Sequence, residues 1–352
     1  MGLSCVQREP IKSRLSLDTT LISNNIVHFY RYMNYMLCTW EIQDFAHETN
    51  VYITGTMGIA ILGGIMDSLN SSSQSSEQEQ NLPPRLPNRF NATCRSDRSA
   101  SRIKNELGKY NANLNVIQSD NVRAMKEADV VLLACKPFYV KDVLQAEGVR
   151  EALEGKLLIS ILAGVPEAQL EDLLYPGLSH EQVREKITIV RTMPNTASKV
   201  RESMTVINQS TPPLPQDTKN LVHWMMSRIG KVVEIEPKNM DACTALCGSG
   251  PAFAALIMEA LADGGVAMGI PRAEANLMAA QVMRGTTGLV QDGEHPAILR
   301  EKVSTPGGCT IGGLLALEDG AVRSHVSRAV REATVVASLL GSGAKNVNGT
   351  RH

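Results

Sequence analysis

The feature that most constrains the fold is an alternation of short strand-like runs with helix-like segments, which stops near residue 238. Each strand-like run is apolar and rich in β-branched residues, and the segments between them show helical spacing, as at residues 100–110 and 140–153. The expected strands are residues 51–54, 90–94, 114–117, 130–134, 157–162, 187–191, 204–208 and 231–235. Because strands that alternate with helices build α/β folds, the sequence predicts a doubly wound, mostly parallel sheet.

After residue 238 the pattern contains helices only. We expect these helices at residues 242–268, 272–291, 296–303, 310–317 and 322–340. Gly269 and Pro271 end one helix and start the next, and Gly320 and Gly341 end theirs. Apolar residues lie on most faces of these helices, which indicates that a partner subunit covers one of the faces.

Four segments follow from these patterns. Half of all Phe, Trp and Tyr residues lie before position 53, and residues 1–50 form an atypical N-terminal segment, which we expect to be disordered. Residues 51–238 form a dinucleotide-binding domain with a flexible polar insertion at 70–88. Residues 239–341 form a helical dimerisation and substrate domain, and residues 342–352 form a disordered tail.

The composition excludes several classes of partner. Lys and Arg number 35 and Asp and Glu number 36, without a block of like charge, so nucleic acid is not an expected partner. The seven cysteines include no C-x-x-C pair and the seven histidines no H-x-x-x-H pair, so no metal site is expected. The scattered cysteines also argue against a disulfide framework and favour a reducing compartment.

No membrane-spanning segment is expected either. Glu259 and Asp263 interrupt the most apolar stretch, residues 252–268. Arg8 and Arg14 are typical of a mitochondrial presequence, but Glu9 stands between them and weakens that signal. We therefore expect a cytoplasmic protein with a small molecule as its partner.

Several turns follow the expected strands, at the edge where ligands bind in open α/β sheets. Gly55-Thr56-Met57-Gly58 stands between a strand and a helix, where backbone N–H groups and the helix dipole can hold a pyrophosphate. Arg95 and Ser96 follow the second strand and suit a 2′-phosphate. Ala134-Cys135-Lys136-Pro137 and Met193-Pro194-Asn195-Thr196 end two later strands at the same edge. Each of these motifs is also consistent with an ordinary strand-ending turn.

Two glycine-rich motifs lie in the helical half. In Ser304-Thr305-Pro306-Gly307-Gly308-Cys309-Thr310, exposed N–H groups at a helix start can bind a carboxylate, and a hydroxyl beside them can contact a substrate nitrogen. Leu246-Cys247-Gly248-Ser249-Gly250-Pro251 falls inside a long apolar helix, where glycine and proline are costly. For this second motif a close helix crossing is favoured over a catalytic role.

Taken together, these motifs resemble those of the pyrroline-5-carboxylate reductases. The resemblance runs from residue 51 to residue 341 and also includes Asp263-Gly264-Gly265, and the loop 303–310 looks like the family's signature. It implies a Rossmann-like domain followed by an all-helical dimerisation domain. It also implies NADPH-dependent reduction of 1-pyrroline-5-carboxylate to L-proline by hydride transfer to the ring imine, the final step of proline biosynthesis, with NADH as another usable cofactor.

The resemblance assigns roles to individual residues. It implies that the adenosine, pyrophosphate and nicotinamide parts of the cofactor contact residues at the sheet edge, and that the substrate lies in the signature loop of a homodimer or larger homo-oligomer. The expected cofactor-binding residues are Gly55, Thr56, Met57, Gly58, Arg95, Ser96, Asn121, Ala134, Lys136, Pro137 and Asn195. The expected substrate-binding residues are Ser304, Thr305, Gly307, Gly308, Cys309 and Thr310, and Thr310 is the expected catalytic residue.

Two departures from the family leave alternatives open. Residues 1–50 have no counterpart in it, and Ile53 replaces the first glycine of the cofactor loop. One alternative is therefore a catalytically impaired helical oligomer of the same family. Another is a β-hydroxyacid dehydrogenase, although Ala254 stands where that family has a catalytic lysine.

Overall fold

The computed structural model describes residues 49–53, 56–70, 83–84, 86–110 and 113–341, together with residues 344 and 347. The predictions for nearly all of the N-terminal segment, for Gly55, for most of the insertion and for most of the tail lie outside these residues.

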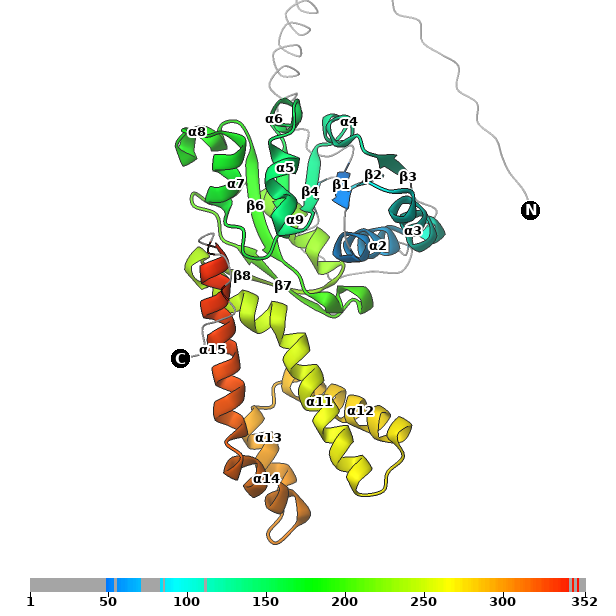
Figure 1. Ribbon diagram of the computed structural model, residues 1–352, viewed down its shortest axis with the longest axis vertical. Helices are drawn as coiled ribbons and strands as arrows, with labels where there is room; N and C mark the ends of the chain where they lie inside the picture. Colours follow the sequence, from blue (N-terminus) through cyan, green and yellow to red (C-terminus); the bar gives the residue numbers. More distant parts are fainter. Residues whose placement is uncertain are drawn as a thin grey trace, which may run out of the picture. The chain divides into compact units, whose positions relative to one another are not determined.

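The first domain is built on one sheet with the strand order β3-β2-β1-β4-β5-β6-β7-β8 (Figure 1). Its strands are β1 (Thr49–Ile53), β2 (Arg89–Cys94), β3 (Asn113–Gln118), β4 (Val130–Ala134), β5 (Leu157–Ser160), β6 (Thr188–Met193), β7 (Ser203–Asn208) and β8 (Gly230–Ile235). All neighbouring strands pair in parallel except β6 and β7. The first six strands have the order 3-2-1-4-5-6 of a doubly wound dinucleotide-binding sheet, and the predicted fold class is confirmed.

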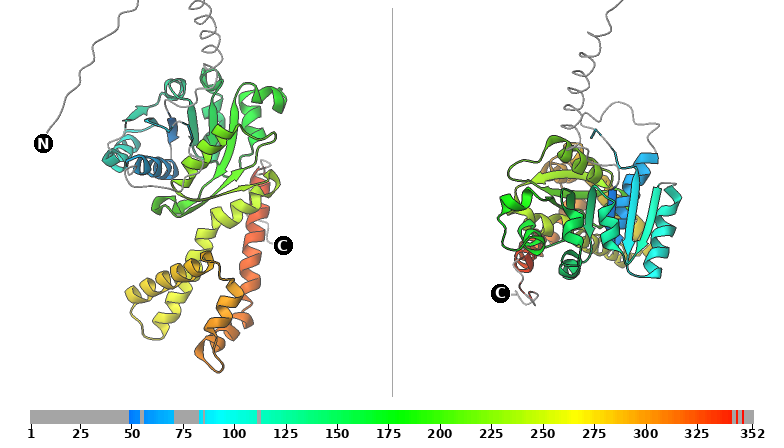
Figure 2. Two further views of the ribbon diagram at one scale, coloured as in Figure 1. Left: turned by 180° about the vertical axis from the view of Figure 1, so that it is seen from behind. Right: turned by 90° about the horizontal axis from the view of Figure 1, so that it is seen from above.

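Helices cover both faces of this sheet (Figures 1 and 2). They are α2 (Thr56–Asn70), α3 (Asp97–Leu107), α4 (Asn121–Lys126), α5 (Val140–Leu144), α6 (Val149–Leu153), α7 (Glu167–Leu174), α8 (His180–Arg184) and α9 (Gln216–Ser227). Strand β4 is buried along its whole length, because side chains that alternate in direction meet helices on either side. Val131 and Leu133 pack with the residues of α5, α6 and α7 in one apolar cluster.

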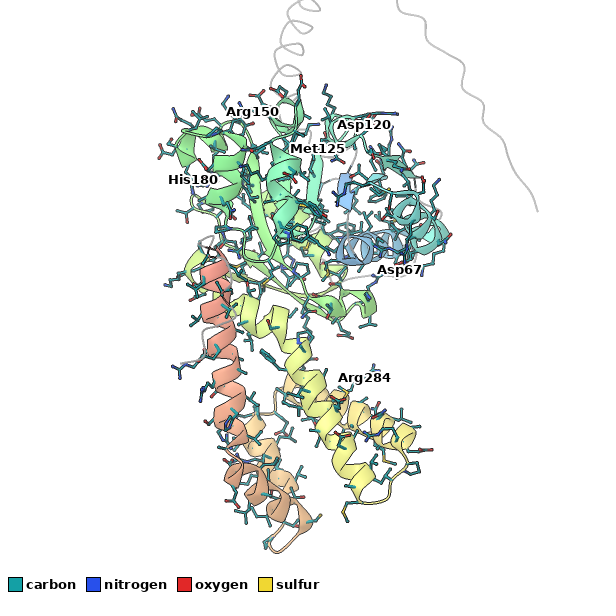
Figure 3. The ribbon with its side chains drawn as sticks, in the orientation of Figure 1. Asp67, Asp120, Met125, Arg150, His180 and Arg284 are labelled. Carbon is teal, nitrogen blue, oxygen red and sulfur yellow. The ribbon has the colours of Figure 1, made fainter. Side chains whose placement is uncertain are left out.

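One helix prediction in this domain is wrong. Residues 140–153 form two short helices, α5 and α6, instead of one. Gly148 separates them with φ 81°, a left-handed conformation that cannot continue a right-handed helix. Side-chain caps stand at the starts of α3, α4 and α8. At α4 the cap is Asp120, labelled in Figure 3, which accepts a hydrogen bond from the Arg123 N–H (3.0 Å).

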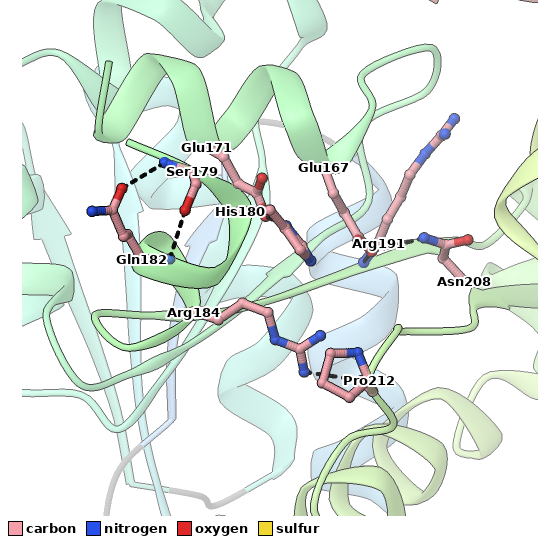
Figure 4. A network of polar contacts seen from close by, with 9 residues as sticks. All are labelled: Glu167, Glu171, Ser179, His180, Gln182, Arg184, Arg191, Asn208 and Pro212. Atoms are coloured by element: carbon pink, nitrogen blue, oxygen red, sulfur yellow. Dashed lines mark hydrogen bonds and ion pairs between the residues drawn. The ribbon is translucent and has the colours of Figure 1, made fainter. Parts of the chain in front are cut away.

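Polar side chains also connect the far strands to the helices beside them. The Glu167 carboxylate of α7 accepts hydrogen bonds from the Arg191 backbone N–H (3.1 Å) and from Asn208 Nδ2 (2.9 Å), as Figure 4 shows. The buried guanidinium of Arg191 has its pKa lowered by desolvation, an effect that the charges of Asp241 and Glu167 oppose. These contacts hold β6 and β7 together where the two strands run in opposite directions.

The second part of the chain is helical, as the sequence predicts. Its helices are α10 (Met240–Cys243), η5 (Thr244–Ser249), α11 (Gly250–Ala267), α12 (Arg272–Gln291), α13 (Pro296–Val303), α14 (Cys309–Asp319) and α15 (Val322–Gly341). The expected single helix over residues 242–268 is wrong in one respect, because η5 is a π-helical turn that divides it. Pro251 is tolerated beside this turn because it stands in the first turn of α11.

Large apolar side chains of these helices remain exposed. Met268 is 85% exposed, Leu277 71% and Leu256 66%, whereas the contact between α11 and α12 buries mainly the small residues Ala262, Ala275 and Ala279. Soluble proteins rarely leave so much apolar surface uncovered unless another molecule binds it.

The expectation that no helix is long enough to span a membrane is also wrong. The helical run Pro237–Ala267 reaches the required length and apolar composition, since it begins well before residue 252. Only the length and the composition of this run are typical of a membrane-spanning helix, and the run also packs against other helices of the helical domain. Asp241 Oδ2 accepts a hydrogen bond from Ser338 of α15 (2.8 Å), and Asp263 forms an ion pair with Arg272 of α12 (2.6 Å).

Candidate active site

A cavity of about 420 Å³ lies at the carboxyl edge of the sheet. Because the parallel strands β4, β5 and β6 all end at this edge, the segments that follow them meet there. The helical turn η5 closes the cavity from the second part of the chain. The lining residues are Met57, Ala134, Cys135, Lys136, Pro137, Ile161, Leu162, Ala163, Met193, Pro194, Asn195, Thr196, Thr244, Gly248 and Ser249.

The start of α2 contributes to this cavity. Thr56 is the first residue of the helix, Met57 lines the cavity and Gly58 is buried, while Gly55 lies outside the described residues. The first N–H groups of a 15-residue helix have no intrahelical acceptors, and the helix dipole favours negative charge at this end. This end of α2 can therefore bind a phosphate group.

The end of β4 forms the neighbouring wall. Ala134, Lys136 and Pro137, which the sequence predicts to lie near a nicotinamide ribose, line the cavity. Burial raises the pKa of the Cys135 thiol from its ordinary 9.0 to about 11, and the positive charge of Arg95 partly offsets this rise. Cys135 is therefore a neutral packing residue at neutral pH, whereas the exposed Lys136 can reach an anion.

The residues expected at the adenosine end lie outside the cavity lining. Arg95 follows β2, and its guanidinium carbon lies 4.1 Å from the centroid of the Tyr139 ring. The Ser96 hydroxyl accepts a hydrogen bond from the Ser99 N–H (3.3 Å) and so caps α3. Asn121 begins α4, directly after β3. All three follow strands at the same sheet edge, and Arg95 contacts Tyr139, two residues beyond the cavity-lining Pro137.

The expected substrate loop lies between α13 and α14. Thr305-Pro306-Gly307-Gly308 forms a type II turn, with Gly307 at φ 67° and the Gly308 N–H donating to the Thr305 carbonyl (3.1 Å). A β-carbon on Gly308 would lie 2.4 Å from Thr305 Oγ1 and 3.2 Å from the Thr305 carbonyl oxygen, so a larger residue here would displace the Thr305 side chain. The turn leads directly into the first turn of α14, where Cys309 and Thr310 stand.

The chain does not bring this loop to its own cofactor-side cavity. None of the residues from Ser304 to Thr310 lines that cavity. Ser304 is engaged elsewhere, since its hydroxyl donates to the Arg300 carbonyl (2.8 Å). Thr310 is half-buried in the first turn of α14. The two groups of predicted site residues are thus separate within one chain.

Sequence reasoning missed part of the cavity wall. Ile161, Leu162 and Ala163 follow β5, a position that the strand prediction could have indicated. Thr244 and Ser249 come from η5, and the signal for them was the costly glycine and proline pair near residue 250. Within the part of the chain that the structure describes, no cluster of three or more potential metal ligands occurs.

The doubly wound sheet, its edge cavity and the helices that follow define a two-domain oxidoreductase of the dinucleotide-binding class. Residues 54–164 match the family "NADP oxidoreductase coenzyme F420-dependent", and residues 237–340 match "Pyrroline-5-carboxylate reductase dimerisation".

Individual relatives are more specific. Pyrroline-5-carboxylate reductase of Lophium arboricola is 58% identical over 302 residues, 84% of this chain and 94% of the relative. The enzyme of Neurospora crassa is 58% identical over 316 residues, 85% of this chain and 94% of the relative. The structure of Plasmodium falciparum pyrroline carboxylate reductase with NADP bound has a TM-score of 0.65 and 26% identity, over 85% of this chain and 99% of that one. The chain belongs to the pyrroline-5-carboxylate reductase family, and these relatives give no support to the β-hydroxyacid dehydrogenase alternative.

Proposed function

We propose that this protein reduces 1-pyrroline-5-carboxylate to L-proline with NADPH, as the last step of proline biosynthesis. The observation that carries the proposal is that a chain of this family has both a cavity at the sheet edge and a glycine turn at the start of α14. The cavity at the sheet edge suits a dinucleotide, and the glycine turn at the start of α14 suits a carboxylate.

The residues at the sheet edge fit NADPH. The α2 N-terminus faces a cavity suited to the pyrophosphate, and Lys136 and Pro137 stand where the nicotinamide ribose would bind. Arg95 supplies a guanidinium that can pair with the 2′-phosphate, which supports NADPH over NADH. The relative from Plasmodium falciparum was solved with NADP bound. The bound reduced nicotinamide supplies the hydride.

The start of α14 suits the substrate. The N–H groups of Cys309 and Thr310 lie at the positive end of an 11-residue helix and can hold the substrate carboxylate, beside the turn that Gly307 and Gly308 form. The Thr310 hydroxyl can hold the ring nitrogen. A protonated imine is already electrophilic, so these residues need only to orient it and to exclude water.

The two parts of the site require two copies of the chain. The loop 304–310 is not part of the cavity lining of its own chain. The helices on either side of the loop carry exposed apolar side chains. We infer that a second copy covers this apolar surface and brings its loop to the cavity, in a homodimer or a larger homo-oligomer of dimers. The match of residues 237–340 to a dimerisation family supports this arrangement.

We further propose a cytoplasmic location, which the scattered free cysteines support. The described cysteines Cys94, Cys135, Cys243, Cys247 and Cys309 are all free thiols. Reducing compartments keep thiols in this form.

The test uses the purified full-length chain with 1-pyrroline-5-carboxylate and either NADPH or NADH. We expect loss of the reduced nicotinamide absorbance together with formation of proline, faster with NADPH. Dimers by light scattering but no turnover with either cofactor would favour the impaired oligomer, for which Ile53 at the end of β1 is the motivating observation.

A further inference from the structure

The turn η5 differs from the helices on either side of it. Residues five apart on an α-helix lie about 140° apart around the axis, because one turn contains about 3.6 residues. The wider i→i+5 bonding of a π-helix brings such residues onto one face. Thr244, Gly248 and Ser249 of η5 all line the cavity wall, and Thr244 and Ser249 are five residues apart. The π-helical geometry is therefore what presents all three to the cavity.

The end of strand β6 holds this turn from outside. Met193 packs with Met240, and with Cys243 and Cys247 on the same helical run. A β-carbon added to Gly248 would lie 3.7 Å from Met193 Sδ, so the helix approaches the strand closely here. The side-chain amide of Asn195 donates from Nδ2 to the Cys247 carbonyl at 3.0 Å. This hydrogen bond joins the end of the sheet to the middle of the π-helical turn.

Asn195 is fixed by five hydrogen bonds, one of which its carbonyl accepts from the Ser198 N–H (3.1 Å), and it is only 8% exposed. Its backbone N–H donates to Ser203 Oγ (3.0 Å), and its backbone carbonyl accepts from Ser198 Oγ (2.6 Å). Its side-chain Oδ1 accepts from the Ala197 N–H (3.0 Å), so the acceptor is already used within the loop. The remaining group, Nδ2, points to Cys247. The side chain therefore acts on η5 with little capacity left for a ligand.

We propose that Asn195 is a positioning residue, which keeps η5 in its π-helical form so that Thr244, Gly248 and Ser249 shape the cavity beside the nicotinamide. The inference rests on the proposed function, because it concerns the placement of the hydride donor. It assigns Asn195 an indirect role in place of the direct cofactor contact that the sequence suggests.

The main test is Asn195→Asp in the full-length protein. The substitution keeps the size and the acceptor for the Ala197 N–H, but it sets a carboxylate oxygen against the Cys247 carbonyl. We expect faster amide hydrogen exchange in residues 244–250 of the cofactor-free protein, because the turn loses its external hydrogen bond. We also expect kcat to fall by about 10- to 100-fold, since small misplacement of reacting groups is costly. The isotope effect with deuterated NADPH should increase, and KM for NADPH should change by less than about threefold.

The matched control is Ser198→Ala. It removes a buried hydrogen bond to the same residue, from Ser198 Oγ to the Asn195 carbonyl, but leaves the bond to Cys247 intact. We expect a lower melting temperature with normal kcat and normal exchange in residues 244–250. Asn195→Ser provides a second test if the aspartate variant does not fold, because serine can still accept the Ala197 N–H.

The outcomes separate this inference from the proposed function. Unchanged exchange and unchanged kcat in both Asn195 variants would overturn the positioning role. An equal loss of kcat in Ser198→Ala would also overturn it, because general destabilisation would then explain the effect. An inactive wild-type protein would refute the proposed function, while the exchange measurement would still test whether Asn195 holds η5.

Discussion

Selectivity for NADPH should depend on the pair formed by Arg95 and Tyr139. The Arg95 guanidinium lies 4.1 Å from the Tyr139 ring centroid, at the end of β2 where a 2′-phosphate is expected. Arg95→Ala removes a charge-assisted contact worth about 1.5–3 kcal/mol. We therefore expect kcat/KM for NADPH to fall about 10- to 150-fold, and the value for NADH to stay nearly constant, because NADH lacks this phosphate.

The Tyr139 ring should contribute separately. Tyr139 is only partly buried, and it packs against the apolar cluster beneath it. Tyr139→Leu keeps an apolar side chain but removes the aromatic face, which at an exposed site contributes about 0.5–1 kcal/mol to holding a cation. We expect kcat/KM for NADPH to fall about two- to fivefold, again without an effect on NADH. Tyr139→Phe is the matched control, since it keeps the aromatic face and should retain NADPH selectivity.

Initial rates with each reduced cofactor, followed by nicotinamide absorbance, give both ratios in one experiment. Equal losses with NADPH and NADH in Arg95→Ala would refute the reasoning, because they would show that Arg95 does not distinguish the two cofactors. A loss in Tyr139→Phe as large as that in Tyr139→Leu would show that the tyrosine acts through its hydroxyl group and not through the aromatic ring.

Three further predictions concern other parts of the molecule. Gly308→Ala should reduce kcat/KM for pyrroline-5-carboxylate at least about tenfold, because the new β-carbon would lie 2.4 Å from Thr305 Oγ1 and disturb the turn. NADPH binding, measured by calorimetry, should stay intact. The control Gly108→Ala should have no effect, because a β-carbon at Gly108 would meet no atom within 4 Å. Thr310→Ala should lower kcat about 10- to 1000-fold while NADPH affinity stays the same, and an unchanged rate would remove Thr310 from the site. Burial raises the pKa of Cys135 from 9.0 to about 11, so its stabilising contribution, about 2.7 kcal/mol, is fully present below pH 9 and lost as the pH rises to about 11. Denaturant unfolding of Cys135→Ala should therefore lack this alkaline loss.

The sequence predicts best those elements whose limits are encoded locally. The bounds of α12 and α13 agree with the expected helices, because Pro271 and Pro296 stand at their starts and polar or glycine residues follow their ends. Strand β4 is also predicted to the residue, since all five of its side chains are buried and apolar. For η5 the local signal is only partial, because Gly248, Gly250 and Pro251 mark an irregular helix, whereas the hydrogen bond from Asn195 comes from 52 residues away.

The site residues were likewise predictable where local sequence and strand order fix their positions. Residues that directly follow strands, such as Lys136 and Asn195, could be assigned to the sheet edge because topology alone brings those positions together. The hydroxyl of Ser96, expected near the 2′-phosphate, also caps α3, a local role that the sequence motif did not indicate. The placement of the loop 304–310 relative to the cavity depends on assembly, which a single chain does not encode in its local pattern.

The separation of the signature loop from the cavity of its own chain has a genetic consequence. In the proposed dimer each site combines the sheet edge of one copy with the Gly308 turn of the other. A defect at Arg95 of one copy and a defect at Thr310 of the other copy would then fall in the same site. A mixed dimer of the two defective chains would contain one site with both defects and one with none. Two alleles that are each inactive alone could thus complement one another and restore up to half of the sites in every mixed pair.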